Sequence, residues 1–193
     1  MRGEPLNLNL WLKDRDGQIA RRWRAEIRVR EDRRGDDGDG FLGLFLDNLI
    51  SFLAPCLGDY RDAGEEIWQQ ATHLYGSFAL HRGLAAGEVV EELQLLRGVI
   101  LRLLLEDPPE DRGHRGFRRD LLALNEVLDL GVVRASVAYT DDLFFAHLQG
   151  SGVPEGVTAD VEEEMGRQLD SFRKELDRLD PGDSNHGSSD GQG

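Results

Sequence analysis

The chain of 193 residues contains a single cysteine, Cys56. One thiol excludes an internal disulfide and any zinc site built from several cysteines. Cys56 lies in the apolar run 52–57, and a thiol in such surroundings is usually buried and unreactive. We therefore expect Cys56 to be a core residue.

Long uninterrupted apolar stretches are also missing. The most apolar window, residues 41–57, contains Asp47 and Asn48 and is shorter than the roughly 20 residues that span a bilayer. The N-terminus reads Leu-Asn-Leu-Asn-Leu, without the continuous apolar segment of a signal peptide. These features predict a soluble, cytoplasmic protein.

Positive charge is scarce, since 23 Lys and Arg face 37 Asp and Glu, a net charge of −14. Half of this charge lies in residues 151–193, which hold 11 acidic and 4 basic residues. A surface this acidic repels phosphate groups, so nucleic acid and anionic membranes are not expected as direct partners. A basic protein surface, or simple solubility, explains the charge better.

Apolar residues recur at helical spacing over most of the chain, for example Ile19, Trp23 and Ile27. The alternating leucines of residues 6–12 form a pattern too short to predict a strand. The glycine-rich, charged run 33–40 predicts a flexible loop. We expect an all-α fold in which residues 1–150 form an antiparallel bundle of about five helices, around 19–27, 41–57, 61–82, 89–105 and 115–148.

Residues 151–180 are predicted to form a linker and an additional amphipathic helix. The linker is the glycine-rich segment 150–156, and the tail 181–193 has no apolar pattern and is predicted to be disordered. The helix between them carries one narrow apolar seam on a charged surface: Val161, Met165, Leu169, Phe172, Leu176 and Leu179.

The narrow seam leaves two interpretations of this C-terminal helix. Coiled-coil pairing uses a seam of this kind, so the six seam residues are candidates to face a partner protein. In the alternative, the helix folds back and completes the bundle.

No catalytic or metal-binding pattern emerges from the motifs. None of the five histidines forms the Glu-x-x-His pair of a di-iron bundle. There is no Gly-x-Ser-x-Gly, no phosphate-binding glycine loop and no Cys/His arrangement. We therefore expect no enzyme activity, no cofactor and no metal.

Histidine phosphotransfer is a separate possibility, because phosphotransfer domains are themselves helical bundles. Their phosphorylated histidine is followed by lysine and glycine at plus three and plus four. Around His73 the chain reads Thr-His-Leu-Tyr-Gly-Ser, with glycine at plus three and no lysine. The only lysines are Lys13 and Lys174. The pattern does not predict phosphotransfer, but His73 and His81 stay open as alternatives.

Residues 80–97 read Leu-His-Arg-Gly-Leu-Ala-Ala-Gly-Glu-Val-Val-Glu-Glu-Leu-Gln-Leu-Leu-Arg. This segment resembles the N-terminal helical domain of the RsbT co-antagonist (RsbRD) family, which also precedes some bacterial sensor histidine kinases. The Ile19 to Trp23 helix and residues 124–133 are similar to that family as well, so the resemblance covers roughly residues 15–145. It departs from the family at Arg82-Gly83, where a Gln-Gly spacing is more usual. The resemblance implies signal input or protein interaction without enzyme activity.

Physical reasons single out five residues of this region as structural or regulatory candidates. Gly83 permits a tight reversal between two helices. Arg97 is a charge among apolar neighbours and needs a partner. Glu92, five residues earlier, is poorly placed for that role, which makes Asp129 on the next helix the better candidate. The full set is Arg82, Gly83, Glu92, Arg97 and Asp129.

The leading hypothesis is a regulatory helical domain of bacterial stress-response or two-component signalling. Its partner would be a kinase, a phosphatase, a STAS-type protein or a second copy of itself. A phosphorelay protein using His73 or His81 and a small-molecule sensor with a ligand in the bundle core are the two rivals.

Overall fold

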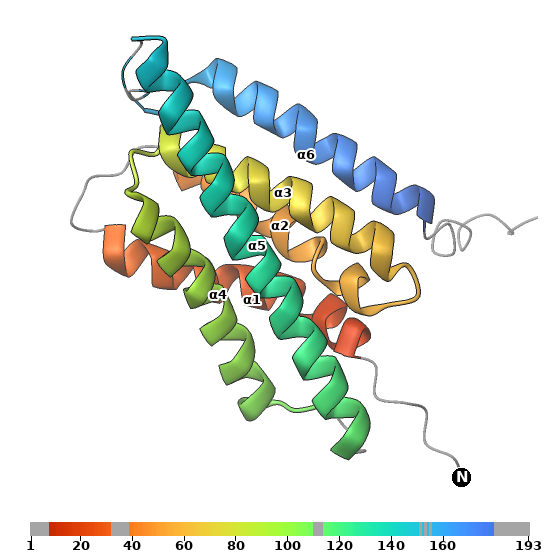
Figure 1. Cartoon of the computed structure of the whole chain (residues 1–193). Helices are drawn as coiled ribbons and strands as arrows, with labels where there is room; N and C mark the ends of the chain where they lie inside the picture. Colours follow the sequence, from red (N-terminus) through yellow and green to blue (C-terminus); the bar gives the residue numbers. More distant parts are fainter. Residues whose placement is uncertain are drawn as a thin grey trace, which may run out of the picture.

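A computed structural model describes residues 8–31, 39–109, 114–150, 152, 154 and 156–179. Over these residues 88% of the chain is helical and no strand occurs, which confirms the predicted all-helical fold. Figure 1 shows the elements in chain order: α1 (Leu8–Glu31), α2 (Asp39–Ser51), the 3-10 helix η1 (Ala54–Leu57), α3 (Arg61–His81), α4 (Ala86–Glu106), α5 (His114–Leu148) and α6 (Ala159–Leu179).

Helix α1 begins earlier than the periodicity around Ile19 indicated. Leu8, Trp11 and Leu12 are buried, whereas Leu10 is 55% exposed. The spacing of three and four residues between the buried positions is helical, so the alternation of leucines was not the relevant signal. The apolar face of α1 thus includes its first two turns.

The second predicted helix, 41–57, is two elements in the structure. Helix α2 ends at Ser51, and η1 follows with Pro55 in its first turn. Proline lacks a backbone N–H and disfavours a helical residue before it, which accounts for the break. Most of the predicted loop 33–40 and all of the predicted tail 181–193 lie outside the described residues.

The segment 40–57 passes a length and hydropathy test for a membrane span. However, 61% of it is buried inside the fold, and Phe45, Leu49 and Phe52 are fully enclosed. Burial of this extent is typical of a core segment.

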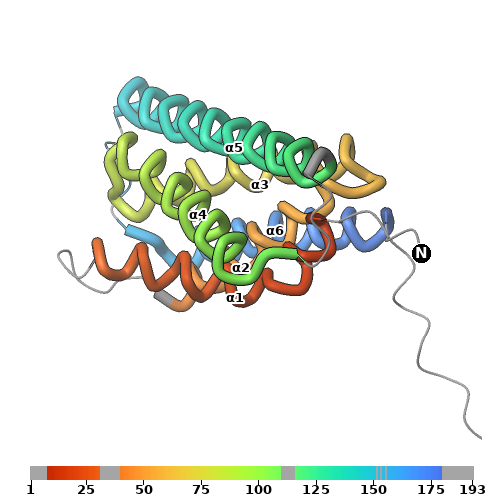
Figure 2. The backbone as a smooth tube through the Cα atoms, turned by 90° about the horizontal axis from the view of Figure 1, so that it is seen from below, coloured from red at the N-terminus to blue at the C-terminus, as the bar shows by residue number. Residues whose placement is uncertain are grey.

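Figure 2 shows α5 along one side of the molecule, with α3 and α4 between it and α1. Helix α3 packs most extensively on α5, and α1 packs on both α2 and α4. The core between these layers is aromatic. Phe45 and Phe78 stack with ring centroids 5.1 Å apart, and Tyr75 lies 5.5 Å from Phe45 and 5.8 Å from Trp23.

Close approach of α3 and α5 depends on two glycines. A Cβ atom at Gly76 would lie 2.1 Å from the backbone oxygen of Ala135, and one at Gly131 would lie 2.8 Å from the ring of Trp68. The indole of Trp68 donates a hydrogen bond of 2.8 Å to the Val127 carbonyl. Glycine is therefore a packing requirement where these helices cross.

Candidate functional site

Residues 80–97 form the end of α3, the reversal between α3 and α4, and the first half of α4. Helix α3 ends at His81, and Gly83 follows with a φ of +71°, a conformation that L side chains rarely adopt. The Glu88 carboxylate accepts a hydrogen bond of 2.7 Å from the Ala85 N–H and so caps α4. Gly83 thus fills the role in the turn that its position in the motif predicted.

Arg82 and Glu92 face each other across this reversal. Two parallel hydrogen bonds of 2.9 Å join the guanidinium to both carboxylate oxygens. The two side chains expose only 6% and 7% of their surface. This is a two-point ion pair in a low-dielectric environment, where geometry decides whether attraction outweighs the cost of desolvation.

Tyr75 completes the cluster. Its hydroxyl donates a hydrogen bond of 2.5 Å to Oε2 of Glu92. Burial raises the pKa of Tyr75 well above its ordinary value, and the Glu92 carboxylate raises it further, so the hydroxyl stays a donor. The sequence does not indicate Tyr75 as a member of this cluster, because nothing in its spacing from Arg82 or Glu92 predicts a contact.

A tryptophan connects the cluster to α1. The Trp23 indole donates a hydrogen bond of 2.7 Å to the backbone carbonyl of Glu92, and the Arg82 guanidinium lies 5.6 Å from the Phe78 ring centroid. Residues from α1, α3 and α4 therefore meet at Glu92. The Glu92 carboxylate already binds Arg82 and Tyr75. The arrangement therefore favours a structural role, in which Glu92 holds the three helices together, over a ligand-binding site.

Arg97 and Asp129 form the ion pair that the sequence predicts. Nη2 of Arg97 on α4 bonds to the carboxylate of Asp129 on α5. The Asp129 side chain is 66% exposed and that of Arg97 is 22% exposed, so water screens this pair. Glu92 takes no part in it, because its carboxylate is bound to Arg82.

The apolar seam of α6 lies against the bundle in this structure. Met165 and Leu169 are buried, and the ring of Phe172 meets that of Phe52 edge-on at 6.3 Å. The other seam residues are partly buried against the core: Val161, Leu176 and Leu179. The alternative in which the helix folds back is thus the arrangement seen here, with α6 seated on α2 and α3.

The segment before α6 is built on glycines with positive φ, namely Gly150, Gly152 and Gly156. None of the three would bring a Cβ within 4 Å of another group. Glycine therefore serves the backbone path here and not close packing.

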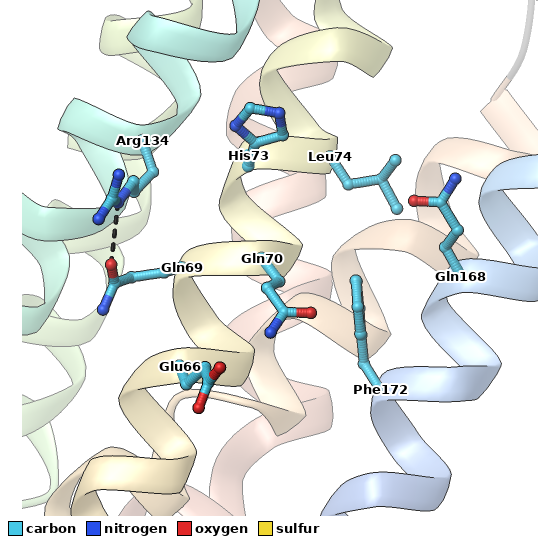
Figure 3. A pocket seen from close by; sticks show the side chains of 8 residues that line it. All are labelled: Glu66, Gln69, Gln70, His73, Leu74, Arg134, Gln168 and Phe172. Carbon is cyan, nitrogen blue, oxygen red and sulfur yellow. Dashed lines mark hydrogen bonds between the residues drawn. The ribbon is translucent and has the colours of Figure 1, made fainter.

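A shallow groove of about 460 Å³ lies between α3, α5 and α6 (Figure 3). Exposed His73 is one of its lining residues, and Nε of Arg134 donates a hydrogen bond of 2.9 Å to the side-chain oxygen of Gln69. Its other lining residues are Glu66, Gln70, Leu74, Gln168 and Phe172. This groove is at the surface, not in the bundle core where a sensor ligand was considered.

The remaining reactive candidates are less accessible. His81 is half-buried, and this burial lowers the pKa of its imidazole. Cys56 is buried as expected, and burial raises the pKa of its thiol. Over the part of the chain that the structure describes, no group of three His, Cys, Asp or Glu could hold a metal ion.

Comparison with known proteins found no match to a protein-family model, to a curated protein or to a solved structure.

Proposed function

We propose that this chain is a non-enzymatic regulatory domain of bacterial stress-response or two-component signalling, which acts in the cytoplasm through protein–protein interaction. The resemblance of residues 80–97 to the RsbRD family supports the signalling context. The observation that carries the interaction function is the way α6 is attached to the bundle.

Helix α6 is attached through an apolar contact that is only partly buried. Two of its residues, Met165 and Leu169, are buried, and the other four seam residues are partly buried. Burial of one such side chain contributes about 1.5–3 kcal/mol, so the two buried side chains supply about 3–6 kcal/mol. A partner with a matching apolar groove can therefore compete with the bundle for the same seam.

The outer face of α6 helps it to remain helical when it leaves the bundle. Arg167 pairs with Glu164 at 2.6 Å and lies 4.0 Å from Glu163, both within one turn of the helix. Such pairs stabilise isolated helices slightly. The glycines between α5 and α6 permit the necessary change in backbone direction. In this proposal the apolar seam of α6 contacts either the bundle or a kinase, phosphatase or STAS-type partner.

Truncation after Gly150 tests this function. We expect the truncated chain to keep most of its melting temperature, because the α3–α5 packing and the Glu92 cluster remain. It should lose binding to the signalling partner, whereas a peptide of residues 157–180 should bind that partner alone. Leu169→Asp should abolish binding of the peptide, and the exposed Arg173→Ala serves as the matched control. If truncation unfolds the chain, α6 is core and the proposal is wrong.

One observation favours a second candidate function. His73 is exposed in a groove that Arg134 also lines, and a guanidinium can stabilise a phosphoryl group on a nearby imidazole (Figure 3). Of the two histidines considered for phosphorelay, His73 therefore has the better position, because His81 is half-buried.

A further inference from the structure

The outer face of α5 carries an exposed apolar stripe that neither the core nor the proposed α6 exchange uses. The stripe residues are between 44% and 66% exposed: Leu122, Val133, Val137, Phe144 and Leu148. Leu130, on the same face, is half-exposed. Solvent-exposed apolar residues are common singly, but five on one face of a single helix, interrupted by Glu126 and Thr140, are not.

Helix geometry places this row opposite the packed face of α5. Ala135 faces α3, since its backbone oxygen is the atom that Gly76 approaches. At about 100° per residue, Val133 and Val137 lie roughly 160–200° around the helix from Ala135. Figure 2 shows α5 at the side of the molecule with no other described helix beyond it.

The spacing makes the stripe straight. Leu122, Val133 and Phe144 are 11 residues apart, and so are Glu126, Val137 and Leu148. An 11-residue period is close to a whole number of turns of a straight α-helix, so the row does not drift around it. From Leu122 to Leu148 it runs about 39 Å at 1.5 Å per residue.

We propose that a second copy of this chain covers the stripe, with the two α5 helices antiparallel. A two-fold axis between Val133 and Val137 places each of these valines opposite the other in the partner copy. The same axis places Leu122 opposite Leu148. The row is therefore complementary to itself.

Charge favours the antiparallel arrangement. Glu126 is the one ionised residue among the six positions of the 11-residue pattern, and its side chain is 72% exposed. A parallel pair in register would put two Glu126 carboxylates opposite each other, which is unfavourable. The antiparallel pair puts Glu126 opposite Phe144 instead, and the Glu126 carboxylate lies 3.7 Å from Nη2 of Arg61 in its own chain.

The size of the stripe fits an interface between two copies. The observed exposed fractions correspond to roughly 500 Å² of apolar surface, within the range of the largest patch on a typical monomer, which is often functional. Complete burial of the stripe in both copies would remove about 1,000 Å², so flanking polar surface must contribute as well for the contact to reach the roughly 1,200 Å² of a specific interface.

The oligomeric state of the full chain tests the proposal. We expect sedimentation analysis at tens of micromolar to show a dimer, and Val133→Glu with Val137→Glu to give a monomer with an unchanged helical spectrum. The control is Leu105→Glu, because Leu105 on α4 is 84% exposed but outside the stripe. A monomeric parent chain, or a dimer that survives the double substitution, overturns the proposal. Loss of partner binding on removal of α6 tests the proposed function and does not bear on the dimer.

Cross-linking tests the orientation and does not depend on a destabilising charge. Leu122→Cys and Leu148→Cys each add one exposed thiol, while Cys56 is buried and acts as an internal control. In the antiparallel dimer a short bis-maleimide should link the two variants only after they are mixed, because identical sites lie about 39 Å apart. Efficient linking of either variant to itself overturns the antiparallel arrangement.

Discussion

Glu92 is the residue on which three helices depend. Its carboxylate binds Arg82 and Tyr75, and its backbone carbonyl accepts a hydrogen bond from the Trp23 indole. Removing one partner of a buried ion pair leaves the other charge uncompensated, which costs more than the pair itself contributes. The free energy of unfolding of variants in this cluster therefore shows whether Glu92 holds the three helices together or makes only an incidental contact.

We expect Glu92→Gln to lower the free energy of unfolding by about 3–5 kcal/mol, because Arg82 is left buried without a carboxylate. The neighbouring Glu91→Gln is the control: Glu91 is 64% exposed and pairs with Arg30, so it should cost less than about 1 kcal/mol. Urea denaturation measures both. Equal effects of the two substitutions would contradict the structural role of Glu92.

The second residue-scale prediction concerns His73. Under the leading proposal, incubation with acetyl phosphate or a cognate kinase leaves no acid-labile phosphohistidine on the chain, because the lysine that follows the histidine in phosphotransfer domains is missing. Labelling with radioactive phosphate measures this directly. A label that disappears in His73→Gln but remains in His81→Gln would instead establish the phosphorelay alternative.

At the scale of elements, the contact between α3 and α5 depends on the absence of side chains. Gly76 has no space for even one carbon, since its Cβ would meet the Ala135 oxygen, whereas a Cβ at Gly87 would meet nothing within 4 Å. Alanine normally stabilises a helix by about 0.5–1 kcal/mol relative to glycine. The same substitution should therefore have opposite effects in α3 and α4.

We expect Gly76→Ala to destabilise the fold by about 1–3 kcal/mol, because the two helices must separate. Gly87→Ala, at an open position in α4, should be neutral or slightly stabilising. Thermal unfolding of both variants provides the comparison. A neutral Gly76→Ala would mean that α3 and α5 do not approach as closely as described.

At the scale of the whole molecule, the net charge of −14 sets which partners are electrostatically accessible. Like charges repel the chain from phosphate-rich polymers and surfaces, and this repulsion is strongest at low ionic strength. The proposed partners of α6 and of the α5 stripe are accordingly proteins, bound through apolar contact.

We expect no co-sedimentation of the chain with anionic lipid vesicles and no shift of duplex DNA in a gel, even at low salt, where non-specific binding of basic proteins is strongest. A basic protein of similar size provides the positive control. Salt-sensitive binding to either ligand would show that a local basic patch overrides the net charge.

Helical periodicity alone determined that the chain is all-helical and where most helices lie, because apolar faces repeat every three to four residues wherever a helix packs. Other local features located three further residues: the apolar run around it placed Cys56 in the core, the conformational freedom of glycine placed a turn at Gly83, and a charge among apolar neighbours paired Arg97 with Asp129. Periodicity did not reveal that Leu8 to Leu12 are helical. The alternating leucines fit the period of two of a strand, and Leu8 and Leu12 also fit the spacing of four of a helix.

Tertiary structure decided the features that depend on residues far apart in the sequence. The contact of Tyr75 with Glu92, the crossing at Gly76 and the seat of α6 on α2 and α3 each depend on how the helices are arranged. The stripe on α5 is another such feature, since its apolar residues look like core residues until the packed face is known. Local sequence specifies which side of a helix is apolar, but only the arrangement of the other helices determines which of those sides remains uncovered.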